Sequence, residues 1–169
     1  AQCTDKRVNL VTPNLFARYP DAGALAAAEQ GELEAVVRST GFYANKAKNL
    51  IGMAQRLDEF HNGEVPGGMA ELTALPGVGR KTANVVRSVT LGLPGLPVDT
   101  HVGRLSRRLG MTSETDPVKV ERELNPMIQA SERGVFSLRL ILHGRRVCAS
   151  RRPVCEDCVL NDFCPSSQV

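Results

Sequence analysis

Aromatic side chains are scarce in this sequence of 169 residues, which has no tryptophan, two tyrosines and five phenylalanines. Sheets that bind single-stranded nucleic acid stack bases on aromatic side chains, so that class of protein is disfavoured. Long apolar runs are also lacking. The longest candidate, SVTLGLPGLPV, is interrupted by glycine and proline and is shorter than the roughly 20 residues that a membrane span needs. We therefore expect neither a membrane span nor a signal peptide.

Acidic residues are missing from two stretches, although the net charge of the chain is only +3. Asp99 is the single acid between residues 80 and 108, and no acid occurs between residues 133 and 152. Six basic residues share the first stretch, namely Arg80, Lys81, Arg87, Arg104, Arg107 and Arg108. Clustered basic side chains favour a polyanionic partner because binding releases counterions from a phosphate backbone. A solvated helix face is the alternative.

Almost every segment of the chain has helical features, which predicts an all-α fold. Apolar residues share one face over 43–60, and the sequence HNG is expected to end that helix. Asp116 followed by Pro117 is typical of a helix start. The run GVFSLRLILHG is expected to be a buried helix, since no partner strand is evident. The turn-rich stretch LGLPGLPVDT, at 91–100, is the best candidate for a boundary between two lobes.

The stretch LPGVGRKT, residues 75–82, predicts a tight turn between two helices. Pro76, Gly77 and Gly79 separate the helical runs MAELTA and ANVVRSVTL. Such a turn can aim several N–H groups outward, and these groups bind phosphate together with the helix dipole. The dipole and Arg80 also disfavour the ammonium form of Lys81, and a neutral amine is a nucleophile. Lys81 is therefore either a nucleophile or a simple phosphate contact.

Asp99, in VDTHV, precedes a segment with apolar residues at helical spacing and is expected to be its N-cap. A carboxylate at the start of this helix could also stabilise positive charge on a sugar or move a proton. The sequence offers no Ser-His-Asp set and no phosphate-binding P-loop.

Four of the five cysteines lie close together, with the spacing C-x6-C-x2-C-x5-C: Cys148, Cys155, Cys158 and Cys164. This pattern predicts a metal site, whereas paired disulfides would suit a secreted protein. Spacing alone does not decide between zinc and a 4Fe–4S cluster. Either group would fix the C-terminal loop onto the body of the protein. Arg151 and Arg152 lie between the first two ligands and are expected to contact phosphate.

Taken together, these motifs resemble the endonuclease III family of helix-hairpin-helix DNA glycosylases. The resemblance covers essentially the whole chain and rests on AQCTDKRVN, HNGEVP, LPGVGRKTANVV, VDTHVGRLSRRLG, LILHGR and the four cysteines. It implies a six-helix barrel lobe over residues 1–93 and a cluster lobe over residues 94–169, with double-stranded DNA in the cleft between them. It also implies a 4Fe–4S cluster on the four cysteines. Relatives have a further N-terminal helix, which we expect to be absent from this chain.

The resemblance also assigns roles to single residues. The family's nucleophilic lysine falls on Lys81 and its catalytic aspartate on Asp99. Residues 75–81 would hold the DNA backbone near the lesion. Gln2 stands where relatives fill the gap left by the extruded nucleotide, and Phe42 stands where they carry an apolar wedge, often leucine. The implied DNA contacts are thus Gln2, Phe42, Leu75, Gly77, Gly79 and Arg80, to which the cysteine loop adds Arg151 and Arg152.

The implied reaction is removal of an oxidised pyrimidine followed by β-elimination at the abasic site, through a Schiff base on Lys81. A monofunctional mismatch glycosylase is one alternative, although such relatives usually lack a lysine at this position. A non-catalytic helix-hairpin-helix module that only grips DNA is another. We expect a monomer in the bacterial cytoplasm, associated with the nucleoid, or in an equivalent reducing compartment.

Overall fold

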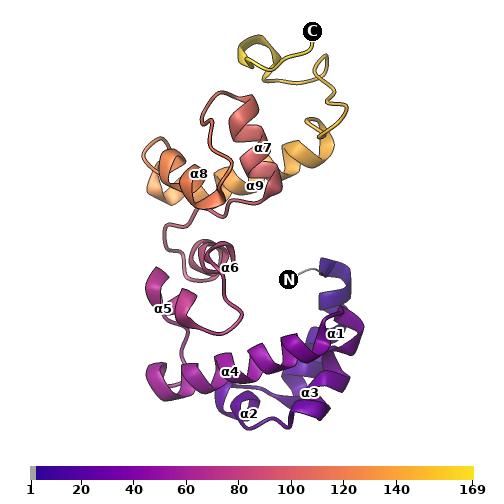
Figure 1. Ribbon diagram of the computed structural model, residues 1–169, viewed down its shortest axis with the longest axis vertical. Helices are drawn as coiled ribbons and strands as arrows, with labels where there is room; N and C mark the ends of the chain where they lie inside the picture. Colours follow the sequence, from indigo (N-terminus) through magenta and orange to yellow (C-terminus); the bar gives the residue numbers. More distant parts are fainter. Residues whose placement is uncertain (1–2) are drawn as a thin grey trace. The chain divides into compact units, whose positions relative to one another are not determined.

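The computed structural model describes residues 3–169, and every regular element in that range is helical (Figure 1). The predicted all-α fold is therefore confirmed. The chain forms two compact units, residues 1–78 and residues 79–169, and each is described by itself below. No helix within residues 3–169 is long and apolar enough to cross a membrane.

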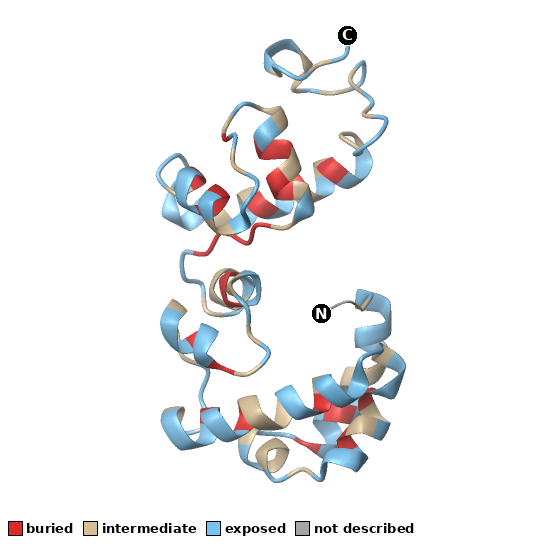
Figure 2. Ribbon diagram, in the orientation of Figure 1, coloured by how far each residue is buried: buried red, intermediate tan, exposed pale blue. Residues whose placement is uncertain are grey.

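The first unit is built around one long helix, α4. The elements are α1 (Asp5–Arg18), α2 (Ala22–Ala26), α3 (Gln30–Val37), the 3₁₀ turn η1 (Arg38–Thr40), α4 (Tyr43–His61) and α5 (Met69–Ala74). Both α2 and α3 pack on α4, and α1 packs on α3 (Figure 1). Burial concentrates where these helices meet (Figure 2), and the core residues are Leu15, Tyr19, Leu33, Val37 and Ala47.

Helix boundaries in this unit follow the sequence signals closely. Asn62 adopts the left-handed conformation directly after α4 and ends it, as the HNG stretch predicts. Helix α1 begins at Asp5, where the hydroxyl of Thr4 caps it by accepting a hydrogen bond from Arg7 N at 3.3 Å.

The second unit packs three helices around the loop that precedes α7. Its elements are α6 (Arg80–Val85), the π-helical turn η2 (Val86–Thr90), α7 (Thr100–Arg108), α8 (Pro117–Leu124), the 3₁₀ turn η3 (Ala130–Glu132), α9 (Arg133–Arg146) and the 3₁₀ turn η4 (Asn161–Phe163). The core residues come from the loop, α7, α8 and α9, and are Leu96, Val98, Val102, Leu105, Val120, Leu124 and Leu140. The run GVFSLRLILHG is helical, as predicted, and forms part of α9. The prediction that this helix is buried is wrong for one face, since Val135, Leu138 and Leu142 are exposed.

The predicted lobe boundary at 93/94 does not coincide with the division of the structure into compact units. Helices α1 to α6 all fall within residues 3–93, the range predicted for the six-helix lobe. The most compact division, however, separates Val78 from Gly79, so that α6 groups with the C-terminal elements. The boundary at 93/94 therefore stays a prediction.

Candidate functional site

The turn at the end of the first unit depends on Gly77. Pro76 and Gly77 occupy its two central positions, and Val78 N donates to Leu75 O at 3.1 Å. Gly77 has φ +76°, and a Cβ on it would lie 2.9 Å from the Cβ of Asn49. Both the backbone angle and the close approach therefore exclude a larger residue, as expected where a tight turn needs a left-handed residue.

Leu75 stabilises this turn from inside the protein. Its side chain is buried, its N–H donates to Leu72 O, and its carbonyl accepts the bond that closes the turn. These contacts give Leu75 a structural role. Its predicted place among the DNA contacts stays a prediction that the geometry supports only indirectly.

Gly79, at the start of α6, differs from Gly77 in both conformation and surroundings. Its φ of −87° is open to any residue, and a Cβ on it would meet nothing within 4 Å. Within residues 3–169, no side chain caps α6, so the first N–H groups of the helix keep their hydrogen-bonding capacity. Gly79 is therefore not needed for its backbone angle. Its missing side chain leaves free space beside the exposed N–H groups at the start of α6.

Arg80 is paired with a buried carboxylate, although its own side chain is 39% exposed. Its Nε and Nη2 donate to the two carboxylate oxygens of Glu121, at 2.7 and 2.9 Å. These hydrogen bonds raise the pKa of Arg80 above its ordinary value. The charge of Arg80 is therefore already paired, and its predicted DNA contact stays a prediction.

Lys81 and Asp99 line the same two open pockets of the second unit. The smaller pocket, of about 540 Å³, also includes Thr100, Arg107 and Thr115. The larger, of about 790 Å³, continues along α9 and includes Ser88 and Arg145. Lys81 is exposed, and Asp99 is half-buried. An amine and a carboxylate thus share a solvent-accessible hollow large enough for a small ring.

The predicted N-cap at Asp99 is confirmed. Its Oδ1 accepts hydrogen bonds from His101 N at 2.8 Å and Val102 N at 2.9 Å. No described residue donates to Oδ2 at hydrogen-bond distance. One oxygen therefore fixes the carboxylate at the start of α7, and the other keeps its capacity to interact with a bound molecule.

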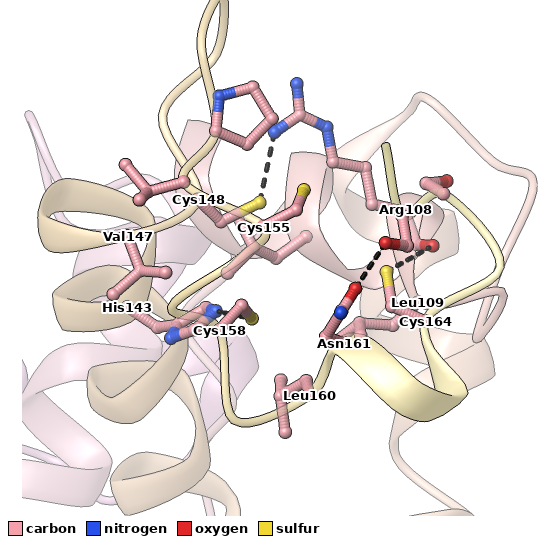
Figure 3. A pocket seen from close by; sticks show the side chains of 15 residues that line it. Arg108, Leu109, His143, Val147, Cys148, Cys155, Cys158, Leu160, Asn161 and Cys164 are labelled. Carbon is pink, nitrogen blue, oxygen red and sulfur yellow. Dashed lines mark hydrogen bonds between the residues drawn. The ribbon is translucent and has the colours of Figure 1, made fainter. Parts of the chain in front are cut away.

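The four clustered cysteines line one further pocket of the second unit (Figure 3). Apolar residues surround them, including Leu105, Leu109, Val147 and Leu160. Among the described residues, no three histidine, cysteine, aspartate or glutamate side chains group closely enough to hold one metal ion. Four soft thiol donors in an apolar pocket nevertheless form the donor set that iron–sulfur clusters and structural zinc use.

Two arginines of α7 hold the cysteine loop, and sequence reasoning missed them. Arg108 donates from Nη1 to the sulfur of Cys148 at 3.0 Å (Figure 3). The same Nη1 also donates to Ala149 O at 2.8 Å. Arg104 donates from Nη2 to Gly144 O and Cys148 O, at 3.1 and 2.9 Å. The sequence predicted both arginines to belong to a basic surface for a polyanion. Their partners lie far along the chain, and the spacing of basic residues carries no signal for such pairs.

Four other residues were predicted to contact DNA, and the structure describes three of them. Arg151 and Arg152 are exposed in the cysteine loop. Phe42 is 70% exposed and has φ 50°, a left-handed conformation that is rare for an aromatic residue. A strained backbone that carries an exposed aromatic side chain makes Phe42 a candidate functional residue. Gln2 lies outside the described residues.

Comparison with known proteins shows the class of protein to which this chain belongs. A family model described as HhH-GPD superfamily base excision DNA repair protein matches residues 1–129. The helical turn, the lysine and the aspartate all lie within that match.

Two curated relatives and one solved structure narrow the class. The chain is 54% identical to endonuclease III of Synechocystis sp. and 44% identical to that of Bacillus subtilis; each match covers 99% of this chain and 77% of the relative. A trapped covalent intermediate of endonuclease III with DNA is 44% identical, with a TM-score of 0.89, covering 98% of this chain and 78% of that one. The chain therefore belongs to the HhH-GPD superfamily of base excision DNA repair proteins and, within it, to the endonuclease III family.

Proposed function

We propose that this chain excises oxidised pyrimidines from double-stranded DNA and cuts the strand at the resulting abasic site, with Lys81 as the nucleophile. The observation that carries the proposal is that Lys81 and Asp99 line the same pockets in a member of the endonuclease III family. A related endonuclease III has been trapped as a covalent intermediate with DNA, which supports an amine mechanism for this chain as well.

The first step exchanges one bond at C1′ of the sugar for another. The base must first leave the stack, because its glycosidic bond cannot be reached inside the duplex. The neutral amine of Lys81 then attacks C1′ with its lone pair, and the glycosidic electron pair leaves with the base, which takes up a proton. Loss of the ammonium proton and opening of the sugar ring give a Schiff base between Nζ and C1′.

The second step uses the same covalent bond. The protonated imine acidifies the hydrogens on C2′. A base removes one such proton, and the electron pair of the C2′–H bond forms a double bond between C2′ and C3′. The C3′–O bond breaks, and the 3′ phosphate leaves with its electron pair. Water then hydrolyses the imine and regenerates the amine. One lysine thus serves both glycosylase and lyase steps.

Asp99 can assist this reaction while it still caps α7. Its Oδ1 is fixed by two backbone N–H groups at 2.8 and 2.9 Å, which leaves Oδ2 for the substrate. A carboxylate held at this position stabilises the positive charge that develops on the sugar as the base departs. It can also take the proton that Nζ of Lys81 loses after it has attacked C1′.

DNA binding is assigned to exposed residues of both units. The free N–H groups at Gly79 and Lys81 suit a phosphate, and Gly77 shapes the turn before them. Phe42, exposed and held in the left-handed conformation, suits the apolar wedge that props open a duplex. Arg151 and Arg152 add positive charge for the DNA backbone. We expect one chain to act on one lesion as a monomer.

The four cysteines are assigned to a 4Fe–4S cluster, as is usual in this family. Four cysteine sulfurs fit this group chemically, and Arg108 donates to the sulfur of Cys148 at 3.0 Å. When bound, the cluster would crosslink the C-terminal loop to the segment at Cys148, directly after α9. Cysteines that hold a metal cluster rather than form disulfides suit a reducing compartment such as the bacterial cytoplasm.

Borohydride trapping tests the proposal on two duplexes, one containing a thymine glycol and one containing an abasic site. Reduction of the Schiff base by borohydride makes the adduct permanent. Adducts with both duplexes are expected. An adduct with the abasic duplex alone would indicate a lyase that reads another lesion. Base release without an adduct would favour a monofunctional mismatch glycosylase, and binding without either would favour the non-catalytic module.

A further inference from the structure

A buried carboxylate on α8, that of Glu121, is bonded to α6 on both sides of Lys81. Glu121 is only 5% exposed, and it accepts two hydrogen bonds from Arg80, at 2.7 and 2.9 Å. Its Oε2 also accepts from Asn84 Nδ2 at 3.0 Å. Residues four apart lie on one helix face, one turn from each other. The turn of α6 that carries Lys81 is thus fastened to α8 at both ends.

The same set of hydrogen bonds reaches the loop that leads to Asp99. Asn84 is 3% exposed, and its Oδ1 accepts from Leu96 N at 3.2 Å. The loop also packs closely here, because a Cβ on Gly95 would lie 2.5 Å from Asn84 O. Asn84 therefore joins three segments, namely α6, α8 and the loop before α7.

Stability alone does not account for a charge in this place. Burying a carboxylate is costly, and a well-packed apolar pair of similar volume often stabilises a fold equally well. Directional hydrogen bonds instead fix the relative position of the segments they join. The segments joined here carry Lys81 and Asp99.

We propose that Glu121 is a positioning residue for the reaction, acting through Arg80 and Asn84 to hold Lys81 in register with Asp99. The inference rests on the proposed function, since it takes these two side chains as the reacting pair. A displacement of only about 1 Å at a reacting group can lower a rate by about 100-fold. Loss of Glu121 should therefore slow the covalent step. It should leave the affinity for DNA nearly unchanged, because a buried side chain does not contact DNA.

The test separates chemistry from binding in Glu121→Gln. Glutamine keeps the shape of the side chain but turns one acceptor into a donor that faces the donors of Arg80 and Asn84. The rate of adduct formation is measured with enzyme in excess over an abasic duplex, with borohydride present. Affinity is measured separately on a duplex with tetrahydrofuran at the abasic position, which cannot form a Schiff base. We expect a rate loss of about tenfold or more and a change in affinity below about threefold.

Two further variants make the result interpretable. Glu132→Gln removes a carboxylate that is exposed and lies 3.9 Å from Arg139, and it should match the unaltered chain in both measurements. Arg80→Lys keeps the positive charge but loses the forked geometry, so it should show the same separation of rate from affinity. Circular dichroism at the assay temperature shows whether Glu121→Gln is folded. If it is not, Arg80→Lys alone tests the positioning role.

Each outcome bears on one claim. Folded Glu121→Gln and Arg80→Lys variants with unaltered rates overturn the positioning role. Weakened affinity at an unaltered rate also overturns it and makes Arg80 a DNA contact. Absence of an adduct in the unaltered chain overturns the proposed function first, so the two failures are distinguishable.

Discussion

Asp99 fixes the start of α7 through one carboxylate oxygen, and Lys81 lines the same pockets from the first turn of α6. The two residues reach this arrangement from different elements. Asp99 is set by its bonds to His101 N and Val102 N, and Lys81 is set by the flanking contacts of Arg80 and Asn84 with Glu121. The site is therefore built on hydrogen bonds that leave the amine and one carboxylate oxygen available for chemistry.

Replacing Asp99 by asparagine should separate capping from catalysis. Asparagine caps helices about as well as aspartate, so the free energy of unfolding should change by less than about 1 kcal/mol. Excision of thymine glycol should fall by about 100-fold or more, because the negative charge beside the sugar is lost. Denaturant unfolding and single-turnover excision measure the two effects.

Asp116→Asn is the matched control for this variant. Asp116 caps α8 through Oδ1 with nearly the same geometry, accepting from Val118 N at 3.0 Å and Lys119 N at 2.9 Å. It should leave excision unchanged. Unimpaired excision in Asp99→Asn would reduce Asp99 to a cap.

The two glycines of the turn should respond differently to alanine. Gly77→Ala places a Cβ 2.9 Å from Asn49 in a left-handed conformation, and the conformation alone costs about 1–2 kcal/mol of stability. Gly79→Ala meets no neighbour, so its stability should change by less than about 1 kcal/mol. Affinity for an abasic duplex should nevertheless fall in Gly79→Ala, because the new methyl group occupies the space beside the free N–H groups. Unchanged affinity in Gly79→Ala would contradict phosphate binding at this helix start.

Phe42→Ala should weaken the hold on duplex DNA without weakening the fold. The side chain is 70% exposed, so its removal takes little from the core. Stacking of an aromatic side chain on a base contributes about 1–3 kcal/mol, which corresponds to a loss of about fivefold or more in affinity for an abasic duplex. Phe16→Ala removes an aromatic side chain that is 63% exposed on α1 and serves as the control. Equal affinity in the two variants would exclude the wedge.

Iron content tests the assignment of the cysteine pocket. The purified protein should be brown and contain iron and acid-labile sulfide in equal amounts, about four of each per chain. Cys155→Ala should lose both, because it removes one of four ligands. Cys3→Ala should keep both, since Cys3 lies outside the C-x6-C-x2-C-x5-C set. A colourless protein that contains zinc would overturn the iron–sulfur assignment.

Local features of this protein could be predicted from sequence because their causes are local. The caps at Asp99 and Asp116 and the helix end at Asn62 each depend on a few adjacent residues. The cysteine set was likewise visible, since metal ligands close together in sequence leave a spacing pattern. Resemblance to a known family supplied the roles of Lys81 and Asp99, which their residue types alone left open.

Contacts between distant segments could not be predicted in the same way. Arg80 and Arg108 are indistinguishable from surface arginines in the sequence, yet they bind Glu121 and the Cys148 loop. Arg80 meets its partner only when α6 lies against α8, and Arg108 meets its partner only when α7 packs on α9. The left-handed conformation of Phe42 also has no signal in the sequence, where glycine would be expected at such an angle.

The most direct test of the central claim is borohydride trapping on an abasic duplex, comparing the unaltered chain with Lys81→Ala and with Lys119→Ala. Lys119 lies on α8 beside Glu114 and serves as a control for the loss of one lysine. The account predicts a covalent adduct with the unaltered chain and with Lys119→Ala, and none with Lys81→Ala. An undiminished adduct with Lys81→Ala would contradict it, because another amine would then form the Schiff base.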